Sequence, residues 1–78
     1  MTSAEVIAIV ETTLGRRGVR LEDRLIQDLG AESMDLVSLA AALEDRFGIV
    51  IPQEELPRLD RVADLVACAE SAALQPPR

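Results

Sequence analysis

Three stretches of the chain show apolar residues at helical spacing. Thr2 and Glu5 have the spacing of a capping box, and apolar positions then recur every three or four residues until Gly15, a residue type common at helix ends. The same spacing predicts a second helix over residues 33–47, closed by Gly48, and a last helix that Asp60 can cap. The recurring positions of the first and last helices are Val6, Ile9, Val10, Thr13 and Leu14, and Val62, Leu65, Val66, Ala69 and Ala72.

The segments between these helices are punctuated by glycine and proline. Residues 15–32 lack a long helical period, so we expect a packed loop with one turn beginning near Asp23, and loops of this length are usually functional. Pro52 suits the first position of a short helix over residues 53–56, which Pro57 should stop. We expect residues 73–78 to form a frayed tail. The prediction is a single all-α domain over residues 1–78, a small bundle of three principal helices plus one short helix.

Composition narrows the possible functions. The 78 residues contain no His, Tyr or Trp and a single Cys, so most general bases, metal ligands and nucleophiles are missing. No acid–base or nucleophile pair can be assembled, and we expect a protein without catalysis of its own. No apolar run reaches the roughly 18 residues of a membrane span, and the N-terminus lacks signal-peptide features. We therefore expect a cytoplasmic monomer, and Met1 with the capped first helix favours a free-standing protein over a domain cut from a larger chain.

The net charge of −6 is concentrated in the middle of the chain. Acidic residues outnumber arginines by nine to three in residues 28–64, whereas the flanking segments are neutral. This excess argues against nucleic acid as a ligand and favours partners with basic docking patches, although a merely solubilising surface is the commoner explanation of acidity. The acidic residues are Asp28, Glu32, Asp35, Glu44, Asp45, Glu54, Glu55, Asp60 and Asp64.

The second predicted helix has two apolar stripes when its residues are placed at about 100° intervals. One stripe, with Leu36 and Leu43, is the expected core face. The other contains Met34, Val37 and Ala41 and is bordered by Ser38, Glu44 and Asp45. An apolar stripe edged with carboxylates, starting beside Ser33, has the character of a docking surface. A helix buried on two sides would show the same pattern, so both interpretations stay open.

The segments around this helix resemble the acyl carrier protein family. They are Asp28-Leu29-Gly30-Ala31-Glu32-Ser33-Met34-Asp35, then Leu43-Glu44-Asp45-Arg46-Phe47-Gly48-Ile49 and Ile51-Pro52-Gln53-Glu54-Glu55. The family motif is Gly-Ala-Asp-Ser-Leu-Asp, followed by a downstream Phe and an Ile-Pro before a short helix. The resemblance covers roughly residues 3–72. Glu32 and Met34 depart from the motif, which usually has Asp and Leu there, and Glu is a poorer N-cap than Asp.

The resemblance implies a carrier whose Ser33 receives 4′-phosphopantetheine from coenzyme A through a magnesium-dependent phosphopantetheinyl transferase. Ser33 alone would be an ordinary N-cap, but nearby backbone N–H groups and the helix dipole also favour a phosphate there. Acyl intermediates would be held as thioesters and delivered to synthase enzymes, in a specialised fatty-acid or polyketide pathway. An aminoacyl or peptidyl carrier, or an unmodified carrier-like binding module, are the alternatives. The expected partner-binding residues are Glu32, Met34, Asp35, Val37, Ser38, Ala41, Glu44 and Asp45.

Overall fold

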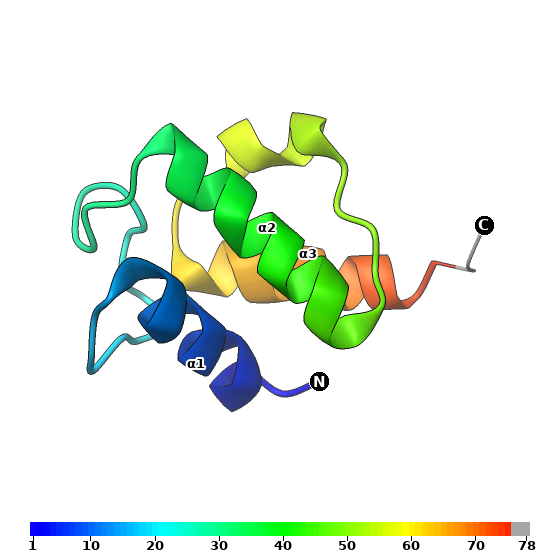
Figure 1. Ribbon diagram of the computed structural model, residues 1–78, viewed down its shortest axis with the longest axis horizontal. Helices are drawn as coiled ribbons and strands as arrows, with labels where there is room; N and C mark the ends of the chain where they lie inside the picture. The colour runs from blue at the N-terminus through cyan, green and yellow to red at the C-terminus, as the bar shows by residue number, and fades with distance from the viewer. Residues whose placement is uncertain (76–78) are drawn as a thin grey trace.

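The computed structural model describes residues 1–75 and confirms an all-α bundle (Figure 1). Its elements are α1 (Ser3–Leu14), α2 (Ser33–Phe47), η1 (Gln53–Arg58) and α3 (Val62–Ala73). Helix α2 runs across the middle of the molecule, with α1 packed on one side of it and α3 behind it (Figure 1). The buried side chains of the four elements and of the segments between them form one core, in which Leu25, Leu39, Leu43 and Leu65 are completely enclosed.

Helix α1 begins and ends where the sequence predicts. The Glu5 N–H donates to Thr2 Oγ1 at 3.2 Å, and the Thr2 N–H donates to Glu5 Oε1 at 3.0 Å, which completes the capping box. At the other end, Gly15 adopts a left-handed φ of 65° and its N–H donates to the Glu11 carbonyl. Local sequence therefore sets both ends of this helix.

The short helix and the start of α3 differ from the prediction. Element η1 is a 3₁₀ helix that continues through Pro57 to Arg58, and Pro52 is its N-cap and not its first helical residue. The Leu59 N–H donates to the Leu56 carbonyl at 3.2 Å, so the hydrogen bonding passes over Pro57, which has no N–H to donate.

Asp60 does not cap α3, because Arg61 is the N-cap residue. The Asp64 carboxylate, one turn inside the helix, accepts hydrogen bonds from the backbone N–H groups of Arg61 at 2.8 Å and Asp60 at 3.0 Å. The Asp60 carboxylate instead lies 3.8 Å from Arg24 Nε. The cap is therefore supplied from within the helix.

The loop over residues 15–32 is packed, as predicted, and it is fastened to the start of α3. The Leu25 N–H donates to the Asp60 carbonyl at 2.8 Å, and the Val62 N–H donates to the Asp23 carbonyl at 3.0 Å. Ala63 adds a third bond of this kind, from its N–H to the Leu21 carbonyl at 2.9 Å. These bonds fix the loop that leads to α2. Of the predicted tail, Ala73 still belongs to α3, and residues 76–78 lie outside the described chain.

Candidate functional site

Ser33 is the first residue of α2 and is exposed. The backbone that leads to it is ordered by hydrogen bonds, because the Gly30 N–H donates to the Ile26 carbonyl at 3.1 Å and the Ala31 N–H donates to the Leu25 carbonyl at 2.9 Å. Gly30 has a φ of 72°, a left-handed conformation that favours glycine. A folded loop thus presents Ser33 at the surface.

The N-cap of α2 is Glu32, so Ser33 does not have the N-cap role that a serine at a helix start usually has. Within residues 1–75 the Ser33 hydroxyl has no hydrogen-bond partner, and neither do the backbone N–H groups of Ser33 and Met34. Free N–H groups at a helix N-terminus and the helix dipole stabilise a phosphate there. The local structure therefore fits a phosphodiester on the Ser33 oxygen.

Asp35 serves the helix start itself. Its Oδ2 accepts a hydrogen bond from the Glu32 N–H at 2.8 Å, and its side chain is half-buried. The sequence placed Asp35 among the partner-binding residues, but this carboxylate already has a structural partner. The signal was present in the sequence, since Asp35 follows Glu32 by the three residues of a capping box.

The second apolar stripe of α2 lies at the surface. Met34 is 70% exposed and Val37 is 38% exposed, and Ser38, Ala41 and Asp45 are exposed as well. The core is packed by the opposite stripe, which consists of Leu36, Leu39, Ala40 and Leu43. The interpretation of α2 as a helix buried on two sides is therefore wrong for this stripe.

Glu44, which the sequence places at the border of this stripe, is half-buried. Its Oε2 accepts a hydrogen bond from the Ile51 N–H at 2.7 Å, which ties the last turn of α2 to the segment before η1. Its neighbour Asp45 is exposed and has no polar partner within residues 1–75. Of the two carboxylates predicted to border the stripe, Glu44 has a backbone partner and Asp45 has none among the described residues.

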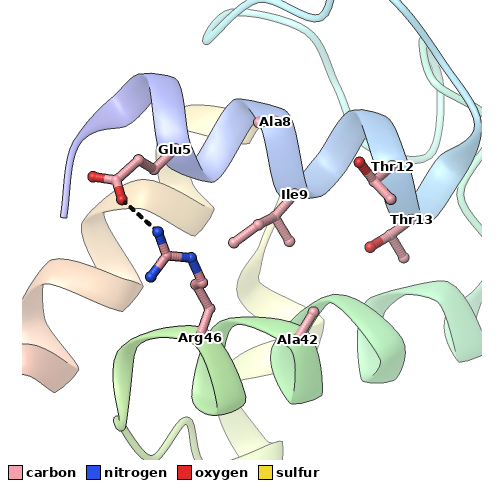
Figure 2. Close-up of a pocket in the computed structure, with 7 residues that line it drawn as sticks. All are labelled: Glu5, Ala8, Ile9, Thr12, Thr13, Ala42 and Arg46. Atoms are coloured by element: carbon pink, nitrogen blue, oxygen red, sulfur yellow. Dashed lines mark hydrogen bonds and ion pairs between the residues drawn. The ribbon is translucent and has the colours of Figure 1, made fainter.

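A groove of about 320 Å³ lies at the surface between α1 and α2 (Figure 2). Ile9 and Ala42 face each other across it, the Glu5–Arg46 ion pair of 3.3 Å closes one end, and threonine hydroxyls lie at the other. The groove contains no nucleophile beside a base, so it offers no arrangement for covalent catalysis. In the described part of the chain, no group of three or more His, Cys, Asp or Glu side chains could hold a metal ion.

None of the helices within residues 1–75 has the length and apolar character needed to cross a membrane.

A bundle that presents an exposed, unpartnered serine at the start of its central helix has the architecture of a carrier domain with a covalently attached arm. A family model described as the phosphopantetheine attachment site matches residues 4–69.

Relatives and solved structures agree with this class. An acyl carrier protein of Helicobacter hepaticus is 38% identical over 69 residues, covering 88% of this chain and 91% of the relative. One of Campylobacter hominis is 35% identical over 65 residues, covering 83% and 82%. The acetyl actinorhodin acyl carrier protein of Streptomyces coelicolor superposes with a TM-score of 0.77 at 26% identity, covering 94% of this chain and 91% of that one. The chain belongs to the acyl carrier protein family, and its cofactor is 4′-phosphopantetheine.

Proposed function

We propose that the Ser33 hydroxyl is the attachment point of the phosphopantetheine arm and that the chain is a carrier without catalysis of its own. The observation that supports this proposal is the exposed, unpartnered Ser33 hydroxyl at the start of α2, beside free backbone N–H groups. When bound, the arm supplies a terminal thiol that holds acyl groups as thioesters. The protein's own residues orient the attachment point and stabilise the phosphate charge.

The exposed stripe of α2 is the proposed docking face for the transferase and for synthase enzymes. Met34, Val37 and Ala41 offer an apolar contact that starts one residue from Ser33, and Glu32 and Asp45 supply free carboxylates beside it. Complementary charge speeds the encounter with a basic partner, and apolar contact then holds the complex. Ser38 lies at the border of the same stripe.

The proposed cargo is an acyl group of a fatty-acid or polyketide type. The relatives are acyl carriers, and a chain in the structure of the ishigamide ketosynthase/chain length factor matches with a TM-score of 0.75 at 30% identity. It covers 91% of this chain and 92% of its own length.

Intact mass spectrometry tests the attachment site. Incubation with coenzyme A, magnesium and a broad-specificity phosphopantetheinyl transferase should add one phosphopantetheine to the wild type and none to Ser33→Ala. Ser3→Ala is the matched control, since Ser3 is an exposed serine at the first residue of α1, outside the proposed docking face, and it should be modified like the wild type. Labelling that persists in Ser33→Ala would refute the site. A wild type that no transferase modifies would favour an unmodified binding module.

A further inference from the structure

A second groove, of about 820 Å³, lies at the end of α2 away from Ser33. It is bounded by the last residues of α2, the extended segment before η1, the start of η1 and the C-terminal half of α3. The C-terminal ends of α2 and α3 lie at the same end of the molecule, away from the α2 N-terminus (Figure 1). The volume lies within the range of ordinary ligand-binding clefts. This groove, which we call the distal groove, is lined in part by Phe47, Val50, Glu54, Glu55, Cys68 and Ala72.

The distal groove combines apolar side chains with unused carboxylates. Val50 is 76% exposed, and Phe47, the only aromatic residue of the chain, is half-buried beside it in the lining. Glu54 and Glu55 take part in no hydrogen bond or ion pair within residues 1–75. Burial raises the pKa of the Cys68 thiol, and the Glu55 carboxylate raises it further, which indicates that Glu55 lies close to Cys68.

The charge of this groove argues against the cargo as its occupant. Ser33 and Phe47 are the first and last residues of α2, about 21 Å apart along the helix axis. An uncharged acyl chain would gain nothing from the two carboxylates, whereas a cationic group would be attracted to them. An occupant with an apolar anchor and positive charge fits both features.

We propose that the distal groove is a second docking surface, which takes an amphipathic helix of a partner protein. Its apolar face packs on Phe47 and Val50, and arginine or lysine side chains pair with Glu54 and Glu55. Because the groove is remote from Ser33, a partner bound there leaves the arm and the α2 docking face free for a second enzyme. The proposal does not depend on modification of Ser33.

Cys68 provides a reporter, since it is the only cysteine and lines the groove. The Ser33→Ala protein, which carries no arm thiol, is alkylated with a maleimide in the presence of a synthetic amphipathic helix. The peptide has about 15 residues, with leucines on one face and arginines along its borders. We expect saturating protection of Cys68. Replacing both Glu54 and Glu55 by Gln should weaken peptide binding by about fivefold, as judged by the peptide concentration for half-protection.

The matched control removes the same charge outside both surfaces, by Glu22→Gln with Glu70→Gln, since both residues are exposed and neither lines the distal groove. Half-protection in this control should occur at the wild-type peptide concentration. Each variant is compared with itself without peptide, because loss of Glu55 alone changes the thiol's reactivity. Absence of protection, or equal weakening in both double variants, would overturn the proposal, since binding would then be absent or unspecific. Protection by decanoate but not by the peptide would also overturn it and would assign the groove to an acyl chain.

Discussion

Glu44 and Asp45 are adjacent carboxylates in the last turn of α2 with opposite structural roles. Glu44 accepts the Ile51 N–H at 2.7 Å in a half-buried setting, whereas Asp45 is exposed without a polar partner among the described residues. We predict that Glu44→Ala destabilises the fold and that Asp45→Ala does not. The two changes have similar effects on the helix dipole, because each removes one negative charge near the C-terminus of α2.

The magnitude follows from the hydrogen bond. A hydrogen bond to a charged group contributes about 1.5–3 kcal/mol, and the partial exposure of Glu44 places the expected loss at about 1–2 kcal/mol. A domain of this size has a free energy of unfolding of about 4–12 kcal/mol. The loss corresponds to a fall in Tm of roughly 5–15 °C. Asp45→Ala should change the free energy of unfolding by less than about 0.5 kcal/mol.

Urea unfolding followed by circular dichroism measures both free energies, and amide hydrogen exchange at Ile51 reports the bond itself. Exchange at Ile51 should be faster in Glu44→Ala than in Asp45→Ala. The effects on transferase kinetics should be the opposite of those on stability. Asp45→Ala should slow modification at low salt, and Glu44→Ala, assayed under conditions where it is folded, should not. Equal stability of the two variants would refute the assignment of structural and docking roles.

Two further predictions concern stability. The backbone N–H groups of Arg61 and then Asp60, with help from the Arg61 guanidinium, lower the pKa of Asp64. The stabilisation by Asp64 is therefore full above the ordinary carboxyl pKa of about 3.9 and is lost as the pH falls through its lower folded-state value. The free energy of unfolding, measured in urea between about pH 2 and pH 6, should fall less at low pH in Asp64→Asn than in the wild type. An equal fall in both proteins would contradict the capping role of Asp64. Gly30→Ala should cost about 1–2 kcal/mol in urea unfolding, because the left-handed φ of 72° strains a residue with a Cβ although no atom lies within 4 Å of it. Gly30→Asn should cost less, and equal losses would argue against backbone strain.

The helices were predictable because their signals are local. The capping box at Thr2 and Glu5, the helical spacing of apolar residues and the glycines at 15 and 48 all act within a few residues of where they stand. The exposed position of Ser33 at the start of α2 follows from the same local signals. The predicted end of the short helix was wrong, because a 3₁₀ helix can continue past a proline that would stop an α-helix.

Contacts between distant segments could not be predicted in this way. The backbone hydrogen bonds between residues 21–25 and 60–63 join segments that are far apart in the sequence, and they leave no periodic pattern in it. Glu44 looked like a surface residue on the helical wheel, and only the path of the chain after Gly48 brings the Ile51 N–H to its carboxylate. Charge pattern alone therefore does not separate carboxylates that accept backbone hydrogen bonds from carboxylates that have no partner.

The acidic residues of this carrier are of two kinds, according to whether they have a hydrogen-bond or ion-pair partner. Of its 14 acidic residues, nine accept backbone hydrogen bonds or pair with arginine, and so help to hold the fold. The other five have no such partner within residues 1–75, and they are Glu32, Asp45, Glu54, Glu55 and Glu70. Carboxylates of the second kind can be substituted with little cost to stability, since no buried donor loses its acceptor. We therefore predict that substitutions at these positions change the binding of basic partners and leave the presentation of Ser33, which depends on the first kind, unchanged.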